Sequence, residues 1–102
     1  MTTDTEVIEK KKTSIRKPKD PGKFNVIVCN DDVTPVEFVV AMLVRVFKHQ
    51  QDAAVKLTIK VHHEGRAIAG TYSHEIAEQR TMDSIQMART HGFPLVVKME
   101  AE

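Results

Sequence analysis

The sequence is most strongly constrained by the helix start at Thr34–Glu37, which reads Thr-Pro-Val-Glu. Threonine suits the N-cap position, and proline suits the first helical position, where no amide hydrogen is needed. Glutamate at the third helical position completes a capping box. Because a residue before proline favours extended backbone, the preceding Asn30–Asp32 should form a short, fixed loop. We therefore predict that one amide and two carboxylates are held at the entrance of a helix.

Hydrophobic periodicity, together with residues typical of helix starts and ends, predicts three helices. An apolar stripe at helical spacing covers residues 35–49. Residues 52–64 fit a strand or a helix, but Asp52 as an N-cap and Gly65 as a left-handed stop favour helix. A third helix should run from an N-cap at Ser73 to about residue 91, before Gly92 and Pro94. Its inner face is predicted to consist of Ile76, Ala77, Ile85 and Ala88.

Three stretches rich in strand-forming residues complete the pattern, at positions 24–29, 66–72 and 95–99. The resulting order is strand, helix, helix, strand, helix, strand. This order predicts the α+β class, with a small three-stranded antiparallel sheet and three helices packed on one of its faces.

The chain of 102 residues is long enough for one small domain. Residues 1–23 differ from the rest because they are basic and poor in large apolar side chains, and we predict a disordered tail there and a folded core over residues 24–102. The net charge of +1 gives no general case for nucleic acid or membrane as a partner. The single cysteine, Cys29, excludes an internal disulfide, fits a reducing cytosol and is predicted to lie buried in a strand.

The Asn-Asp-Asp loop leaves several chemistries open. Paired carboxylates such as Asp31 and Asp32 can hold a metal, exchange protons or bind a cation, and they can also simply form a turn. A metal-dependent hydrolase would add His62, but His62-His63 does not have the spacing of a zinc site. An RNA- or ribosome-associated domain would use the lysines of residues 10–19, although no aromatic residue lies among them to stack on bases. No nucleophile or phosphate-binding motif is present, so a non-enzyme without metal or cofactor is favoured.

Three separated blocks point to a known family. They are Val-Cys-Asn-Asp-Asp-Val-Thr-Pro-Val-Glu-Phe-Val at residues 28–39, Val-His-His-Glu-Gly followed by Ala-Ile-Ala-Gly at 61–70, and Pro-Leu at 94–95. In order and spacing, the chain from Phe24 onward resembles the ClpS family of adaptors. The resemblance implies a non-enzymatic, monomeric protein of the bacterial cytoplasm. Such adaptors deliver proteins bearing N-degrons to the AAA+ unfoldase of the Clp protease.

The resemblance also implies roles for the loop. A free α-amino group has a pKa of roughly 7.7 to 8.0, so it is a cation with three hydrogen-bond donors near neutral pH. By resemblance, Asn30, Asp31 and His62 contact this ammonium, and Asp32 supports the loop. This is the terminal-amine capture mode of peptide recognition.

A pocket for the first side chain is implied next to this loop, with Thr34 at its rim and Val36, Val39, Thr58, Val61 and Leu95 as its lining. Its expected ligands are N-terminal Phe, Leu, Tyr and Trp. The family usually has methionine where this chain has Val36, so the opening could also admit Ile and Val. Thr58 adds a hydroxyl, which should weaken a purely aliphatic fit or favour a ligand with a polar handle. Repacking that preserves ordinary specificity is the open alternative.

A second surface is implied for the partner. Glu75 and Arg80 match family positions that dock onto the N-terminal domain of the unfoldase, with arginine where lysine is more usual. The alternative is that they are two ordinary surface charges, each contributing well under about 1 kcal/mol. The predicted tail would engage the unfoldase pore, a role that asks for length and disorder.

Overall fold

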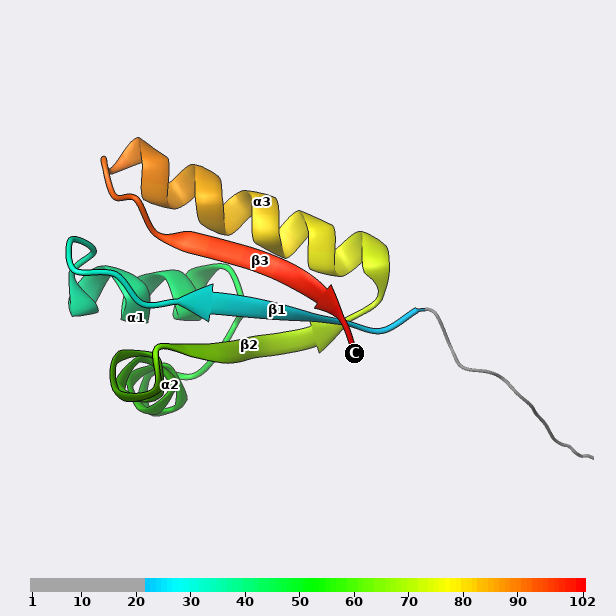
Figure 1. The fold of residues 1–102 in the computed structure, drawn as a ribbon, viewed down its shortest axis with the longest axis horizontal. Coiled ribbons are helices and arrows are strands. Elements are labelled where there is room, and N and C mark those ends of the chain that lie inside the picture. Colours follow the sequence, from blue (N-terminus) through cyan, green and yellow to red (C-terminus); the bar gives the residue numbers. More distant parts are fainter. Residues whose placement is uncertain (1–21) are drawn as a thin grey trace, which may run out of the picture.

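The structure, a computed structural model, describes residues 22–102. The elements follow in the order β1 (Phe24–Cys29), α1 (Val36–Arg45), α2 (Gln51–Glu64), β2 (Arg66–Tyr72), α3 (His74–Thr90) and β3 (Val96–Ala101). The strands form one antiparallel sheet in the order β2-β1-β3 (Figure 1). The predicted α+β class and element order are confirmed. The predicted disordered tail, residues 1–23, lies outside the described residues except for its last two positions.

The core fills the space between the central strand and the helices. In Figure 1, α3 lies alongside β3, α1 lies behind β1 and α2 lies at the β2 edge. The buried side chains that form this core come from every element and include Val26, Val28, Phe38, Val39, Met42, Leu43, Ala54, Val61, Ala67, Ala77, Ala88 and Val97. Because α1 and α2 are anchored by this packing, the ends that face the Asn-Asp-Asp loop are held in place.

The start of α1 differs from the prediction. The helix begins at Val36, with Pro35 as its N-cap residue in extended geometry and without a side-chain capping bond. The capping box predicted for Thr34 and Glu37 is therefore wrong. The box does not form because the Thr34 side chain has another partner: its hydroxyl donates to the Asp31 carboxylate. The Pro35 carbonyl accepts from the backbone amides of the next turn, which starts the helix one residue later than expected.

The end of α1 is also earlier than predicted. The helix stops at Arg45, whereas the apolar stripe predicted helix to residue 49. Lys48 has a φ of 63°, in the left-handed region, and the His49 amide donates to the Leu43 carbonyl at 3.2 Å. Phe47 remains buried although it lies beyond the helix. The stripe therefore identified core residues correctly but could not show where the backbone turns.

Helix α2 resolves the ambiguous stretch in favour of helix. Its N-cap residue is Gln50, and Asp52 lies inside the first turn, where its carboxylate accepts from the Ala53 amide at 2.9 Å. The prediction of Asp52 as the N-cap is therefore wrong by two positions. Gly65 ends the helix with a φ of 90°, which confirms the predicted left-handed stop.

Helix α3 has the predicted N-cap residue, Ser73, but no side-chain capping bond, and Gly92 follows its end with a φ of 78°. Its predicted inner face is wrong at Ile76, which is 43% exposed. Ser84 is fully buried instead, because its hydroxyl donates to the Arg80 carbonyl at 2.7 Å within the helix. A satisfied hydroxyl can enter a core that periodicity alone assigns to apolar residues.

The strands follow the predicted ranges closely. Strands β1 and β2 have the predicted bounds, and β3 begins one residue later and ends two residues later than predicted. Cys29, at the end of β1, is half-buried with a free thiol, so full burial was too strong an expectation. Among residues 22–102, no helix has the length and apolar character needed to cross a membrane.

Candidate functional site

The loop between β1 and α1 is organised around one carboxylate. Asp31 Oδ1 accepts hydrogen bonds from the Val33 and Thr34 amides, each at 2.7 Å. Asp31 Oδ2 accepts from the Thr34 hydroxyl at 2.8 Å. An ionised carboxylate offers about four acceptor positions. Three of them are occupied by the loop's own hydrogen bonds, and these bonds also fix the direction in which the remaining position of Oδ2 points.

These contacts favour the ionised form of Asp31. Partial burial acts to raise the pKa of this carboxyl. The hydrogen bonds from Thr34 and Val33, together with the positive charge of Arg89, outweigh burial and lower the pKa below its ordinary value. Asp31 is therefore a fixed negative charge at neutral pH, held in place before any ligand arrives.

The loop is attached to the end of α2. The backbone N–H of Asn30 donates to the Gly65 carbonyl at 2.8 Å, and the backbone N–H of Gly65 donates to the Val61 carbonyl at 2.9 Å. These two bonds bring Asn30 to the carboxyl end of α2, close to His62. The last carbonyls of a helix carry a partial negative charge, which adds to the attraction that this corner exerts on a cation.

A cleft of about 440 Å³ opens at this corner. It brings together nine of the residues that sequence reasoning named, from the loop, α1 and α2: Asn30, Asp31, Asp32, Thr34, Val36, Val39, Thr58, Val61 and His62. Val33 and Pro35 also line it. The sequence pattern assigns these two only to the turn, although both lie between residues predicted for the site. The cleft is therefore polar on its loop side and apolar on its helix side.

The apolar side is formed by buried helix residues with an exposed rim. Val39 and Val61 are almost fully buried, whereas Val36 is 52% exposed. Thr58 is buried as well, and its hydroxyl donates to the Ala54 carbonyl one turn earlier in α2, at 2.8 Å. The hydroxyl thus has its hydrogen-bond acceptor inside the helix, so burying Thr58 carries little of the desolvation cost expected from its sequence position.

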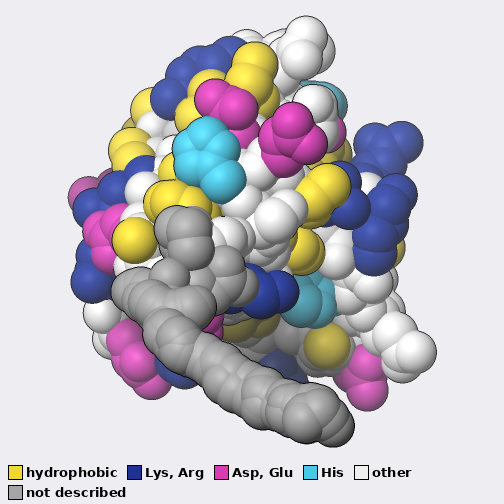
Figure 2. Space-filling model, turned by 90° about the vertical axis from the view of Figure 1, so that its right-hand side faces the viewer, with side chains coloured by type: hydrophobic (Ala, Val, Ile, Leu, Met, Phe, Trp, Pro, Cys, Tyr) yellow, Lys and Arg dark blue, Asp and Glu magenta, His cyan; other side chains and the backbone are white. Residues whose placement is uncertain are grey.

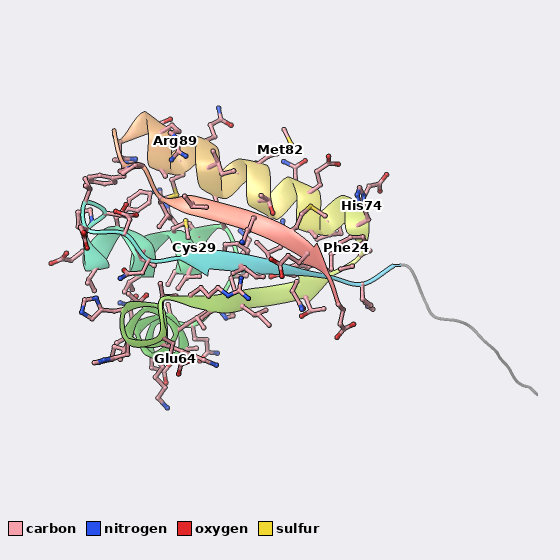
Figure 3. The ribbon with its side chains drawn as sticks, viewed as in Figure 1. Phe24, Cys29, Glu64, His74, Met82 and Arg89 are labelled. Atoms are coloured by element: carbon pink, nitrogen blue, oxygen red, sulfur yellow. The ribbon has the colours of Figure 1, made fainter. Side chains whose placement is uncertain are left out.

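Leu95 stands apart from this lining. It is 1% exposed and belongs to the core cluster, so its predicted role in the pocket stays a prediction. Its carbonyl accepts from Arg89 Nη1 at 2.9 Å, and the Phe93 carbonyl accepts from the same nitrogen at 2.8 Å. Arg89 lies near the end of α3 that faces the loop (Figure 3). It fixes residues 93–95 and lowers the pKa of Asp31, a dual role that its sequence position did not indicate.

The two residues predicted to dock a partner lie on α3. Glu75 is exposed in the first turn, and Arg80 is half-buried, with its guanidinium 5.7 Å from the centre of the Tyr72 ring. In Figure 1 the first turn of α3 lies at the opposite end of the sheet from the β1–α1 loop. Acidic, basic and histidine side chains are intermixed on that end of the molecule (Figure 2). A partner there would leave the cleft accessible.

The metal alternative finds no ligand set in this part of the chain. Among residues 22–102, no three or more His, Cys, Asp and Glu side chains come together in a way that could hold a metal ion. Asp31 uses most of its acceptor positions within the loop. The described residues therefore offer no set of ligands for a metal ion at this site.

Comparisons with known proteins identify the family of the chain. Residues 19–98 match the family described as ATP-dependent Clp protease adaptor protein ClpS. The chain is 38% identical over 96 residues to an ATP-dependent Clp protease adapter protein ClpS of Vibrio atlanticus, a match that covers 94% of this chain and 88% of the relative. It is 37% identical over 97 residues to the corresponding protein of Vibrio cholerae, covering 95% and 89% of the two chains.

A solved structure has the same fold. It is Agrobacterium tumefaciens ClpS2 bound to L-phenylalaninamide, with a TM-score of 0.79 and 31% sequence identity. The similarity covers 81% of this chain and all of that one. Sequence and structure comparisons therefore lead to the same family.

Proposed function

Because the chain belongs to the ClpS family of Clp protease adaptors, which are adaptors and not proteases, we propose that its cleft binds the N-terminal residue of N-degron proteins. The bound proteins are then delivered to a Clp AAA+ unfoldase for degradation. The observation that supports this proposal best is the juxtaposition of a fixed carboxylate loop and an apolar wall in one cleft.

The polar side of the cleft matches the chemistry of a free chain terminus. An α-ammonium needs three acceptors. In this proposal Asp31 supplies its remaining carboxylate position, while the Asn30 side-chain oxygen and a His62 ring nitrogen supply the other two. Asp32 adds negative charge and supports the loop. L-phenylalaninamide, the ligand of the Agrobacterium structure, has such an amino group next to a benzyl side chain.

The apolar side would receive the first side chain. Val39, Thr58 and Val61 form its wall, with Val36 and Thr34 at the rim. Leu95 is not part of this lining, and its proposed contribution comes from the core behind the wall. The expected first residues are Phe, Leu, Tyr and Trp. Since Val36 is short and half-exposed, Ile and Val are included as weaker ligands.

Delivery would use the other end of the molecule. Glu75 and Arg80 are proposed to contact the N-terminal domain of the unfoldase, and residues 1–23 to engage its pore. The adaptor would act as a monomer in the bacterial cytoplasm, and the relatives from Vibrio support a bacterial source alone. No nucleic acid, membrane, metal or cofactor is part of this proposal.

A panel of fluorescent peptides that differ only at their first residue tests the binding role. We expect Phe-, Leu-, Tyr- and Trp-initiated peptides to bind most tightly, Ile- and Val-initiated peptides more weakly, and an Ala-initiated control least. Equal binding across the panel would contradict the proposal. Two further arms address the alternatives, namely RNA over a salt series and Mg²⁺ or Zn²⁺ titration by calorimetry. Strongly salt-dependent RNA binding would favour the nucleic-acid class.

A further inference from the structure

Arg80 on α3 is half-buried, and its guanidinium does not extend freely into solvent. The Arg80 guanidinium lies 5.7 Å from the centre of the Tyr72 ring, a cation–π distance. Its Nε is buried and has no hydrogen-bond acceptor among the described residues. The two Nη atoms are therefore the nitrogens through which Arg80 can bind a partner. Together they form a planar fork that suits a carboxylate.

The position of the Tyr72 ring is set by its neighbours on β2 and at the end of α1. The ring lies over Gly70, where an added Cβ would come within 2.6 Å of the ring carbon Cζ and still closer to the hydroxyl. The ring also stacks on Phe47, with 6.4 Å between the ring centres and an interplanar angle of 28°. We call Phe47, Gly70 and Tyr72 the aromatic shelf. A side chain at position 70 would displace the ring on which the guanidinium rests.

Resting on the proposed docking role of Arg80, we propose that Tyr72 is its positioning residue and that the unfoldase-binding surface extends from α3 to the half-buried Tyr72, with the buried Phe47 and the half-buried Gly70 holding the ring in place. A guanidinium is planar and stacks on an aromatic face, whereas an ammonium does so less well. The shelf thus gives a physical reason for arginine at a position where the family resemblance predicts lysine. The partner surface should present a carboxylate to Arg80 and a cationic or N–H donor group to Glu75.

The test measures binding to the purified N-terminal domain of a Clp unfoldase. Tyr72→Leu removes the ring, Gly70→Ala displaces it, and Tyr72→Phe keeps the aromatic face as a matched control. We expect Tyr72→Leu and Gly70→Ala to weaken binding by roughly two- to fivefold and Tyr72→Phe to stay close to wild type. Affinity for a Phe-initiated peptide, bound at the other end of the sheet, should be unchanged in all three.

A double-mutant cycle separates positioning from general damage. In an Arg80→Ala background, Tyr72→Leu should weaken unfoldase binding no further, because there is no guanidinium left to position. An equal effect of Tyr72→Leu in both backgrounds would overturn the proposal, and so would unchanged binding of Tyr72→Leu and Gly70→Ala.

A partner-independent readout is the proton shift of the Arg80 Nε–H. It should be moved upfield by the ring in wild type and Tyr72→Phe but not in Tyr72→Leu, and an identical shift in all three would also overturn the proposal. If the wild-type protein does not bind the unfoldase domain, both the proposed function and the proposed role of Tyr72 are wrong. Additive effects in a binding-competent protein contradict only the role of Tyr72.

Discussion

The two sides of the cleft are built by different forces. The loop side is fixed by directed hydrogen bonds. Three of them are donated to the Asp31 carboxylate, and one is donated by the backbone N–H of Asn30 to the Gly65 carbonyl at the end of α2. The helix side is formed by the packing of Val39, Thr58 and Val61, with only a half-exposed Val36 at its rim. Removing one partner of a hydrogen-bonded charge costs much free energy, whereas an apolar wall can repack around a change in side-chain volume at a smaller cost.

This contrast separates two properties of recognition. The polar side should decide whether a chain terminus binds at all, because an ammonium in a partly desolvated site needs all its acceptors. The apolar side should decide which first residues are preferred, in graded steps. Substitutions on the two sides are therefore expected to differ in kind as well as in size.

The largest effect is expected for Asp31→Ala, which removes the carboxylate around which the loop folds. Binding of a Phe-initiated peptide should weaken by about 2 to 5 kcal/mol, the typical loss when a desolvated cation loses its charged partner. Titration calorimetry measures this, with Asp52→Ala as the control, since Asp52 is an exposed carboxylate on α2 outside the cleft. If Asp31→Ala binds with nearly wild-type affinity, the polar side does not decide whether a chain terminus binds.

A smaller, selective effect is expected for Val36→Met at the rim. The longer side chain should weaken Ile- and Val-initiated peptides by about 1 to 3 kcal/mol and leave Phe- and Leu-initiated peptides nearly unchanged, as for a methylene-sized change in an apolar pocket. Ile59→Met is the matched control, because Ile59 is equally exposed on α2 but does not line the cleft. Equal losses for all four peptides would mean that Val36 does not set selectivity.

A further effect of about 1 kcal/mol is expected from His62→Ala. The imidazole offers the ammonium a ring nitrogen as an acceptor, and alanine offers none. Affinity for a Phe-initiated peptide, measured by titration calorimetry, should therefore fall in His62→Ala and stay at the wild-type level in the adjacent His63→Ala. Equal affinities of His62→Ala and wild type would exclude His62 as a contact.

The smallest expected effect concerns how the polar side is held together. Thr34→Val removes the hydroxyl that donates to Asp31, so the pKa of Asp31 should rise toward its ordinary value, whereas Thr34→Ser should preserve the lowered pKa. Carbon-13 NMR titration of the carboxyl measures this directly. An Asp31 pKa that is the same in Thr34→Val and wild type would contradict the proposed organisation of the loop.

The same lowered pKa fixes the sign of a stability effect. Because the Asp31 pKa is lower in the folded than in the unfolded state, its ionised form stabilises the fold above the ordinary carboxyl value of about 3.9. This contribution is lost as pH falls through the lowered folded-state pKa. Wild type should therefore exceed Thr34→Val in stability near neutral pH, and this difference should shrink in strong acid.

Sequence patterns predicted the elements well and their ends less well. Apolar spacing located the first helix because its inner face must be buried, and start and stop residues such as Gly65 and Gly92 were needed for the other two. The ends depended on competition for hydrogen bonds that the pattern does not encode. The Thr34 hydroxyl could cap a helix or bind Asp31, and only the folded loop selects the second partner. The buried Ser84 was missed for a related reason, since a hydroxyl that bonds within its own helix can replace an apolar side chain in the core.

The composition of the cleft was predicted mainly through family resemblance. Spacing alone left the Asn-Asp-Asp loop open to several chemistries, because nothing in a single sequence places His62 beside residue 30. The Asn30–Gly65 hydrogen bond makes that connection. Arg89 was missed because its contacts, to the carbonyls of Phe93 and Leu95, are made by a backbone turn that the sequence does not reveal.

Capture of a free α-amino group is tested most directly by comparing one Phe-initiated peptide with its N-acetylated form, titrated into the wild-type protein under the same conditions. Acetylation removes the positive charge and two of the three donors without changing the first side chain. We expect it to cost about 2 to 5 kcal/mol, similar to Asp31→Ala, and to reduce binding to the level of the Ala-initiated control or below. If the acetylated peptide binds with nearly the affinity of the free one, the cleft recognises the side chain alone and the amine-capture mechanism is wrong.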